Sequence, residues 1–498
     1  MKNMKIMMVS AEAVPFAKTG GLADAVSALA GTLSLMGHDV KIVMPRYYKI
    51  DRNSLKKLEG PLGIPVGMGQ EWTAVYYSEL PGYPKVTVYF IDHEQCYGRD
   101  GVYGTKQEPD FFDNPYRFSL LCHGAFQICN KLGWFPDIVH AHDWSAGLAP
   151  VLLKHVCRSQ EQFEHTASVF TIHNLGYQGV YGKDKFSDLG IDWKLYYGAG
   201  FERNGAINFL QAGISCADMV TTVSPTYAKE IQTAEGGFGL DGLLRVRSDV
   251  VKGIVNGVDT TVWNPSLDKN IPFNYSTSDM SGKAKCKAEL QARMGLEVNP
   301  DIPVIGLISR LVSQKGVAEI FAPTYGCLYG MCTTMNLQFV VLGSGERWCE
   351  DEIRALQSKL PNFKAFLGYN EKLSHLIEAG SDFFLMPSQY EPCGLNQMYS
   401  LLYGTLPIVR RTGGLADTVQ NYNEQTGEGT GFMFDQLTPQ AVYDTIGWAM
   451  YAYYNKKDHI AAMQKRAMQQ DFTWEASCTN YLEVYKEAML RGFGGTAE

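Results

Sequence analysis

The sequence predicts an α/β protein made of two doubly wound domains, each with a parallel sheet between layers of helices. The first observation is a regular alternation of short apolar runs with helical segments, which is typical of parallel sheets with helical crossovers. The second is that these runs form two series, separated by a stretch at residues 259–281 with few signs of regular structure. The third is the length of 498 residues, which exceeds what one hydrophobic core supports.

The first series of apolar runs begins at the N-terminus. Residues 5–13 form an apolar run bounded by small residues, and we expect a buried strand there. Gly20 and Gly21 then open a helix with apolar residues at helical spacing, which ends near Gly37. Further strands are expected at residues 39–45, 137–144, 167–174, 218–225 and 250–259.

The second series has the same form, and it fixes the expected domain organisation. Its strands are expected at residues 303–310, 337–345, 364–370, 382–388 and 406–414. A boundary near residue 258 gives a first domain of residues 1–258 and a second domain of residues 259–475. An amphipathic helix is expected within residues 471–490, after the capping residue Thr473, so residues 476–498 form a third part of the chain.

The composition is that of an ordinary globular protein and disfavours several classes. Apolar residues make up 45% of the chain and charged residues 19%, and the net charge is −8. Global disorder and a basic nucleic-acid-binding surface are therefore disfavoured. The 11 cysteines follow no paired spacing, and no apolar run reaches 18 residues. We expect a cytoplasmic protein with reduced thiols and with neither a membrane nor a nucleic acid as partner.

One internal repeat links the two halves of the chain. Residues 18–26 read KTGGLADAV and residues 411–419 read RTGGLADTV, so seven of nine positions are identical. Each copy follows an expected strand and opens an expected helix. Two interpretations remain open: a common turn between strand and helix, or two helix N-termini that face one anionic ligand.

Polar residues at the carboxyl ends of the expected strands form the candidate site, because ligands of open α/β sheets bind there. In the first half these residues are Lys18, His140, His142, Asp143, His173, Asn174 and Asn256. In the second half they are Arg310, Lys315, the turn at residues 343–345, Tyr369 and Glu391.

Two segments of the second half suggest phosphate and sugar chemistry. Arg310 and Lys315 lie in SRLVSQKG, and two cations so close repel each other unless an anion such as a diphosphate pairs with both. The alternative is a solvated loop with surface charges. Glu391 opens the turn EPCGLNQ, where its carboxylate either reaches sugar hydroxyls or caps the helix that begins at Leu395.

Metal and cofactor motifs are weak or missing. His140 and His142 share one face of an expected strand, but no third ligand of matching pattern is evident, so we favour a sugar-hydroxyl or structural hydrogen-bond site. His173 is either a contact of that kind or a core histidine. The chain has no Walker phosphate loop, no Asp-x-Asp pair and no G-x-S-x-G elbow. We expect no metal and no cofactor, so cations and helix N-termini must stabilise any leaving group.

Seven motifs occur together in one order: KTGGLAD, HAHDW, TIHN, NGVD, SRLVSQKG, EPCGLNQ and RTGGLADTV. In this order and spacing they resemble bacterial glycogen synthases and plant starch synthases, the type that uses ADP-glucose. The resemblance covers the chain from residue 5 to the C-terminal helix. It implies a GT-B architecture, with two Rossmann-like domains facing across a cleft. It also implies metal-independent transfer of glucose from ADP-glucose to the non-reducing end of an α-1,4-glucan such as glycogen, with retention of configuration.

The resemblance implies roles for individual residues. Arg310 and Lys315 resemble the pair that neutralises the departing diphosphate, Glu391 resembles the essential carboxylate near the donor sugar, and His173 lies beside the anomeric carbon. The other expected substrate contacts are Lys18 on the sugar nucleotide, Tyr369 on adenine, and Gly20, Gly21, Asp24, Asp143, Asn174, Asn256, Cys393, Gly394, Leu395, Asn396, Thr412, Gly413 and Gly414. The C-terminal helix is expected to return to the first domain.

Three alternatives to this interpretation stay open. One is a transferase of the same fold that uses UDP-glucose, although the animal-type enzymes with that donor lack KTGGL. Another is a catalytically silent glucan-binding protein, which would have no need of Lys18, Arg310, Lys315 and Glu391 together. The last is a glucan phosphorylase with pyridoxal phosphate on a lysine. One departure from the wider superfamily is Tyr399, which stands where a second Glu often binds ribose.

Overall fold

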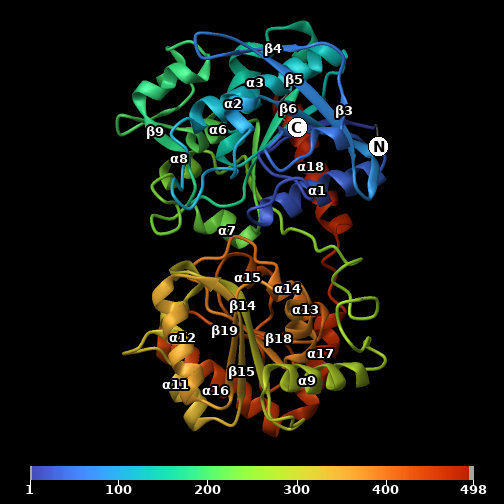
Figure 1. Cartoon of the computed structure of the whole chain (residues 1–498), viewed down its shortest axis with the longest axis vertical. Coiled ribbons are helices and arrows are strands. Elements are labelled where there is room, and N and C mark those ends of the chain that lie inside the picture. The colour runs from blue at the N-terminus through green and yellow to red at the C-terminus, as the bar shows by residue number, and fades with distance from the viewer. Residues whose placement is uncertain (1–2, 493–498) are drawn as a thin grey trace. The chain divides into compact units, whose positions relative to one another are not determined.

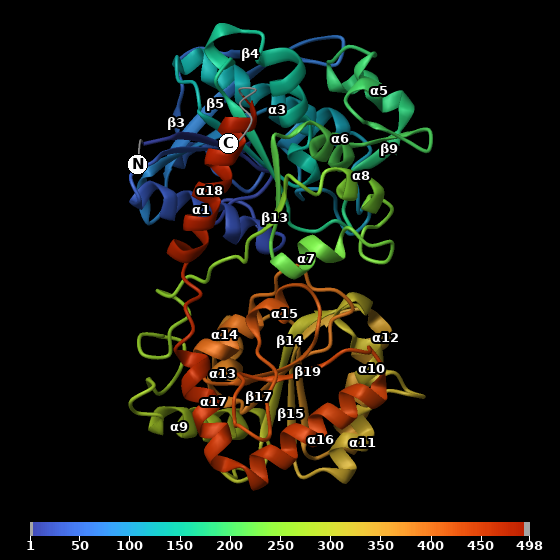
Figure 2. The same cartoon turned by 180° about the vertical axis from the view of Figure 1, so that it is seen from behind.

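A computed structural model describes residues 3–492, and these residues divide into two α/β units. Unit 1 runs to Gly257 and resumes at Trp474, whereas unit 2 is the continuous segment Val258–Thr473 (Figures 1 and 2). Residues 1–2 and 493–498, which belong to the expected first domain and the expected C-terminal part, lie outside the described residues. The prediction of two doubly wound α/β domains is confirmed by the two large sheets.

Unit 1 is built on a 10-stranded sheet. All neighbours from β13 to β6 pair in parallel, and β5 pairs antiparallel with β6, β3 and β4. The order is β13 (Val251–Gly253), β12 (Met219–Thr222), β8 (Ala167–Ile172), β7 (Ile138–His142), β1 (Lys5–Val9), β2 (Asp39–Pro45), β6 (Tyr83–Asp92), β5 (Gly69–Leu80) and β3 (Lys56–Lys57), with β4 (Leu62–Val66) on β5. The order reverses around β1, because β2 lies on one side of it and β7 on the other.

Some predicted strands of unit 1 are too long, and some strands are missed. The prediction of a strand over residues 5–13 is wrong beyond Val9, because the Ser10 hydroxyl bonds to the carbonyl and N–H of Glu12 and turns the backbone away. Likewise β13 covers only Val251–Gly253 of the predicted residues 250–259. No strand is predicted between residues 46 and 136, where β3, β4, β5 and β6 lie.

The helices of unit 1 lie between and beside these strands. Helix α1 (Gly21–Leu35) follows β1 as predicted, and Gly37 lies just past its end with a left-handed φ of 96°. The other helices are α2 (Glu94–Tyr97), α3 (Asn114–Leu132), α4 (Leu148–Leu152), α5 (Leu195–Gly198), α6 (Phe209–Cys216), α7 (Pro225–Glu230), α8 (Asp241–Val246) and α18 (Trp474–Gly492). A small sheet of β10 (Glu202–Arg203), β11 (Ala206–Asn208) and β9 (Val180–Gly182) completes the unit.

The C-terminal helix α18 fills part of the core of unit 1. It runs beside α1 in Figures 1 and 2, and its Tyr481, Leu482 and Tyr485 are buried in the same hydrophobic cluster as the strands. The Tyr485 hydroxyl lies 2.9 Å from Nδ1 of His140 on β7, and Ser477 donates to the carbonyl of Val255 at 2.7 Å. Unit 1 is therefore assembled from both ends of the chain.

Unit 2 contains a six-stranded sheet in which all neighbours are parallel. Its order is β16 (Phe363–Leu367), β15 (Gln338–Gly345), β14 (Val304–Leu311), β17 (Phe383–Met386), β18 (Leu406–Arg410) and β19 (Phe432–Phe434). The chain builds outward from β14 to β16 and then returns to β17 on the other side. The order therefore reverses between β14 and β17, the place where open α/β sheets bind ligands.

Helices cover both faces of the sheet in unit 2. Figures 1 and 2 show α11 and α12 on one side and α9 and α13 on the other. The helices are α9 (Ser281–Met294), α10 (Val317–Phe321), α11 (Leu328–Thr334), α12 (Arg347–Lys359), α13 (Glu371–Gly380), α14 (Asn396–Leu402), α15 (Gly413–Thr418), α16 (Pro439–Asn455) and α17 (Lys457–Met468). This arrangement buries both faces, which explains why the strand sequences are continuous apolar runs.

The segment before α9 is irregular, as predicted, yet it is firmly packed. The indole of Trp263 stacks between the rings of His375 and Tyr399, with centroid distances of 3.9 and 3.8 Å. Next to this stack, the buried carboxylate of Asp268 lies 2.7 Å from Nδ1 of His375 and accepts a hydrogen bond from Tyr403 at 2.5 Å. Tyr399 is therefore a packing residue of unit 2.

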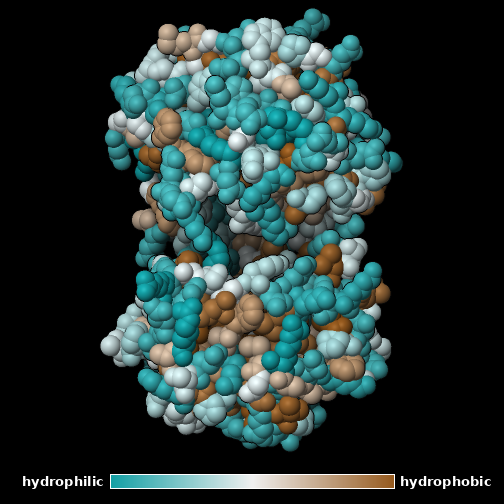
Figure 3. Space-filling view, in the orientation of Figure 1, coloured by the Kyte–Doolittle hydropathy of each residue, from teal (hydrophilic) through white to brown (hydrophobic). Residues whose placement is uncertain are grey.

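Apolar side chains are collected mainly in the two cores. On the face shown in Figure 3, hydrophilic residues predominate and apolar residues form separate small groups. Within residues 3–492, no helix combines the length and the apolar character that crossing a bilayer requires.

Candidate functional site

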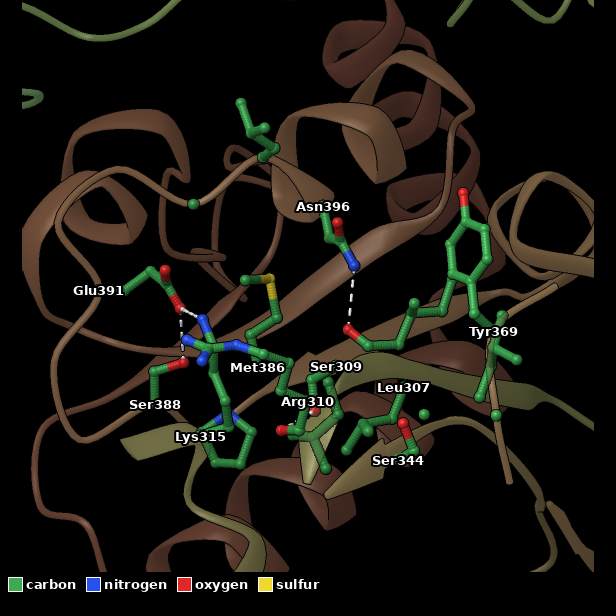
Figure 4. A pocket seen from close by; sticks show the side chains of 18 residues that line it. Leu307, Ser309, Arg310, Lys315, Ser344, Tyr369, Met386, Ser388, Glu391 and Asn396 are labelled. Atoms are coloured by element: carbon green, nitrogen blue, oxygen red, sulfur yellow. Dashed lines mark hydrogen bonds and ion pairs between the residues drawn. The ribbon is translucent and has the colours of Figure 1, made fainter. Parts of the chain in front are cut away.

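A cavity of about 340 Å³ opens in unit 2 at the carboxyl ends of β14, β15, β16 and β17 (Figure 4). This is the point where the strand order reverses, so the fold itself creates the depression. The cavity is lined by Leu307, Ile308, Ser309, Arg310, Lys315, Leu342, Gly343, Ser344, Gly368, Tyr369, Leu385, Met386, Pro387, Ser388, Glu391, Gly394, Leu395 and Asn396. Nine of the sequence-predicted site residues are among them: Arg310, Lys315, Gly343, Ser344, Tyr369, Glu391, Gly394, Leu395 and Asn396.

An ion pair forms one wall of the cavity. Lys315 belongs to a single turn of 3-10 helix, and its ammonium lies 2.6 Å from Oε2 of Glu391 (Figure 4). The same oxygen accepts a hydrogen bond from the Ser388 hydroxyl at 2.9 Å. Glu391 is only 6% exposed, and no side-chain cap of α14 is formed. The carboxylate therefore serves the cavity and does not cap the helix.

Arg310 presents a different kind of cation to the same cavity. It lies on β14, one residue before the strand ends, and its side chain is exposed. Its guanidinium has no hydrogen-bond or ion-pair partner anywhere in residues 3–492. A guanidinium left free at a cavity can bind two oxygens of an incoming anion without first breaking a protein contact.

The far side of the cavity offers an aromatic ring and an amide. Tyr369 follows β16 and is 83% exposed, so one face of its ring is available to a planar ligand. Asn396, the first residue of α14, donates from Nδ2 to the carbonyl of Ile308 at 2.9 Å. That bond ties the start of α14 to β14 and sets the width of the cavity between them.

The second copy of the internal repeat packs against the loop that carries Glu391. Gly413 has a left-handed φ of 43°, and a Cβ atom there would lie 1.9 Å from the carbonyl oxygen of Glu391. The N–H of Gly414 donates to that same carbonyl at 3.0 Å. Thr412, Gly413, Gly414 and the buried Cys393 do not line the cavity. The two glycines instead allow the loop that carries Glu391 to pack closely.

The first copy of the repeat is arranged differently. In unit 1 the turn that holds Lys18, Gly20 and Gly21 is exposed, and a Cβ on Gly20 would meet no atom within 4 Å. The Lys18 ammonium lies 2.8 Å from the Asp24 carboxylate, and both side chains are substantially exposed. The same sequence therefore makes a packed turn in one unit and an open turn in the other.

Histidines gather at the carboxyl ends of β7 and β8 in unit 1. Nδ1 of His142 lies 3.1 Å from Nε2 of His173, and His140 contacts Thr171 at 2.6 Å. Burial lowers the pKa of His140 and His173 to about 3, and it also lowers the pKa of His142. These imidazoles are therefore neutral at pH 7, and they act as hydrogen-bonding groups and not as cations.

Asp143 and its neighbours complete the cluster. Asp143 has a left-handed φ of 56°, and its carboxylate accepts a hydrogen bond from the N–H of His173 at 2.7 Å. Burial raises the pKa of Asp143 to about 7, although the N–H groups of His173 and Asn174 oppose the shift. Asn174 closes its own turn by accepting from Gly176 at 2.9 Å. Asn256 is buried, and no hydrogen bond within residues 3–492 joins it to this cluster.

Sequence reasoning missed two residues that hold these sites. Ser388 hydrogen-bonds Glu391, and Glu12 hydrogen-bonds Thr19 in the open turn of unit 1. The only signal for them is that each is a polar residue near the carboxyl end of a predicted strand, at residues 5–13 and 382–388. Among the residues that the structure describes, no group of three or more His, Cys, Asp or Glu is placed to hold a metal ion.

Two family models match the chain, one in each unit. The model described as starch synthase catalytic domain matches residues 5–246. The model described as glycosyl transferases group 1 matches residues 292–467. The two matches lie on either side of the point at which the chain passes from unit 1 to unit 2.

Individual proteins match nearly the whole chain. The chain is 60% identical over 486 residues to a protein named glycogen synthase from Treponema denticola, and this alignment covers 98% of this chain and 99% of that protein. It is 44% identical over 498 residues to glycogen synthase 1 of Geobacter metallireducens, with 99% and 98% covered. A solved structure, the catalytic domain of starch synthase IV from Arabidopsis thaliana bound to ADP and acarbose, aligns with a TM-score of 0.87 at 30% identity. That alignment covers 98% of this chain and 100% of that chain.

Proposed function

The chain belongs to the family of bacterial glycogen synthases and plant starch synthases, glycosyltransferases of the GT-B fold, and from that premise we propose the following reaction. It transfers glucose from ADP-glucose to the non-reducing end of an α-1,4-glucan, with retention at the anomeric carbon, and so elongates glycogen. The sugar nucleotide binds in the cavity of unit 2, and the glucan is received by unit 1.

The observation that carries this proposal is the composition of the cavity in unit 2. It brings two cations, a buried carboxylate and an exposed tyrosine ring to the switch point of one parallel sheet. ADP-glucose has three parts that match these groups: a flat base, a diphosphate and a sugar with hydroxyls. A cavity of about 340 Å³ is in the range of small-molecule sites.

The cations act on the leaving group. As the glycosidic bond to phosphate breaks, ADP gains negative charge and the glucosyl carbon gains positive charge. Arg310, which has no hydrogen-bond or ion-pair partner among the residues that the structure describes, binds the diphosphate with its planar fork. Lys315 adds a second positive charge at the same edge of the sheet. Groups fixed in advance where charge develops stabilise the transition state more than the ground state.

Glu391 and Tyr369 orient the rest of the donor. The Glu391 carboxylate, held by Lys315 and Ser388, accepts hydrogen bonds from sugar hydroxyls through Oε1. The Tyr369 ring stacks on adenine, and Asn396, Leu395 and Gly394 shape the cavity wall between them. Retention follows if the acceptor hydroxyl attacks the anomeric carbon from the same side as the leaving phosphate. The leaving phosphate then takes the proton of the acceptor hydroxyl.

Unit 1 carries the other residues that we assign to substrate binding. Lys18, Gly20 and Gly21 form an exposed turn that suits an anionic ligand, and Asp24 in the first turn of α1 holds the Lys18 ammonium there. The neutral imidazole of His173, with Asn174 and Asp143 beside it, offers hydrogen bonds to sugar hydroxyls. The buried amide of Asn256 is assigned the same kind of contact.

The test is incorporation of labelled glucose into glycogen from ADP-glucose and, in parallel, from UDP-glucose, with EDTA present. Incorporation from ADP-glucose that Glu391→Ala abolishes is the expected result. Faster incorporation from UDP-glucose would contradict the donor assignment. No incorporation from either donor by well-folded protein would contradict the reaction and favour a silent glucan-binding protein.

A further inference from the structure

The turn that carries Lys18 is anchored to the sheet by one buried side chain, Glu12. Glu12 is 2% exposed and follows the end of β1. Its carboxylate accepts hydrogen bonds from the backbone N–H of Thr19 and from the Thr19 hydroxyl, the latter at 2.7 Å. The Tyr103 hydroxyl donates to the same carboxylate at 2.8 Å.

Glu12 is itself fixed by the strands. The N–H of Ser10 donates to the carbonyl of Val43 on β2 at 3.2 Å. The Ser10 hydroxyl then bonds to both sides of Glu12, donating to its carbonyl at 2.7 Å and accepting from its N–H at 3.1 Å. A continuous series of hydrogen bonds therefore runs from the sheet through Ser10 and Glu12 to Thr19.

The turn has few other supports. Lys18, Thr19, Gly20 and Gly21 are all exposed. The pair between Lys18 and Asp24 lies at the surface, where such pairs contribute little to order. Gly20 precedes α1 without a side-chain cap, and space around it is open. Without Glu12 the turn would sample many conformations, since glycine restricts the backbone least.

We propose that Glu12 is a positioning residue, which holds the turn of residues 18–21 so that the Lys18 ammonium and the following amides meet an anionic substrate. The inference rests on the proposed function, because it takes the sugar nucleotide to be that substrate. Glu12 touches no substrate itself. It acts by fixing Thr19, whose peptide lies between Lys18 and Gly20.

Hydrogen exchange tests the anchor without any need for activity. In Glu12→Ala, amides in a peptide that spans residues 13–23 should exchange faster than in the wild type, whereas peptides from unit 2 should not change. Unchanged exchange of that peptide would overturn the proposal. If the wild type transfers no glucose, the proposed function fails, and this measurement still decides the role of Glu12.

A matched pair of variants separates positioning from general stability. Thr19→Val and Tyr103→Phe each remove one hydroxyl that donates to Glu12 at nearly the same distance, 2.7 and 2.8 Å, but only Thr19 lies in the turn. Thr19→Val should lower kcat/KM for ADP-glucose, and Tyr103→Phe should leave it near the wild-type value. Equal losses in the two variants would contradict a positioning role.

A double-variant cycle with Lys18 gives the sharpest readout. Glu12→Ala alone should lower kcat/KM by about 10- to 100-fold, because misplacing a binding group by about 1 Å costs up to that much. In the Lys18→Ala background the same change should lower kcat/KM by a smaller factor than in the wild type, since one of the groups that Glu12 positions is gone. Effects that multiply would show that Glu12 acts independently of Lys18 and would refute the inference.

Discussion

Removing each of the two cations in the cavity should separate catalysis from stability. Arg310 is exposed and has no hydrogen-bond or ion-pair partner for its side chain within residues 3–492, so Arg310→Ala breaks no such bond of the folded protein. We expect its free energy of unfolding to stay within about 0.5 kcal/mol of the wild type. Its kcat should nevertheless fall by about 10²–10³, or roughly 3–4 kcal/mol, if the guanidinium stabilises the departing diphosphate.

Lys315→Ala should show both losses. Lys315 lies 2.6 Å from a carboxylate whose side chain is only 8% exposed, so the variant leaves that charge without its counter-ion. Breaking a buried pair costs about 3–5 kcal/mol, and the 18% exposure of Lys315 places this pair near 3 kcal/mol. For a unit of this size, about 3 kcal/mol lowers Tm by roughly 6–12 °C.

The assay combines calorimetry with steady-state kinetics on both variants. Calorimetry gives the Tm of each thermal transition, and so shows how far each variant is destabilised. Labelled-glucose incorporation gives kcat. A near-normal kcat in Arg310→Ala refutes its role at the diphosphate. A Tm loss in Arg310→Ala as large as that in Lys315→Ala refutes the description of the guanidinium as free.

Three further predictions follow from other features. Gly413→Ala should destabilise unit 2 by about 1–3 kcal/mol, because the new Cβ would clash with the carbonyl oxygen of Glu391. The control Gly20→Ala should change Tm little, because the space around Gly20 is open. Equal shifts of Tm in the two variants would contradict this prediction. The pKa of Asp143 is about 7 in the folded chain against an ordinary value of 3.8, so stability should fall as pH rises between these values. Asp143→Asn should flatten that pH dependence in denaturant titrations, and an unaltered slope would exclude Asp143 as its source. Tyr369→Ala should raise KM for ADP-glucose about tenfold with kcat nearly unchanged, as expected for a lost stacking contact, and a fall in kcat alone would argue against stacking.

The parallel sheets could be predicted because their strands are buried on both faces. Such strands are continuous apolar runs, and the runs ending near His142, Ile172, Arg310 and Met386 show this clearly. The antiparallel strands of unit 1 were missed, because residues 62–92 mix polar and aromatic residues on a half-buried ribbon. The ends of the strands were also predicted poorly, because a strand extends only as far as its neighbour in the sheet pairs with it.

The candidate site was predicted in its parts, but not in its contacts. Lys315 and Glu391 were chosen from two motifs that lie 76 residues apart, and each was assigned an external ligand. Their ion pair depends on β14 and β17 being neighbours, which neither motif encodes. Glu12 was missed because it fell inside a predicted strand, and only the turn at Ser10 shows that its side chain reaches Thr19.

The return of the C-terminal helix to unit 1 has a consequence for synthesis of the chain. Residues up to Gly257 leave the ribosome first, yet the core that they form still lacks Tyr481, Leu482 and Tyr485. Unit 2 is continuous in sequence and can complete its sheet while unit 1 is still open. A chain that ends prematurely before Trp474 would therefore carry a finished unit 2 and an unfinished unit 1. Unit 1 can therefore close only after the residues of α18 have been synthesised.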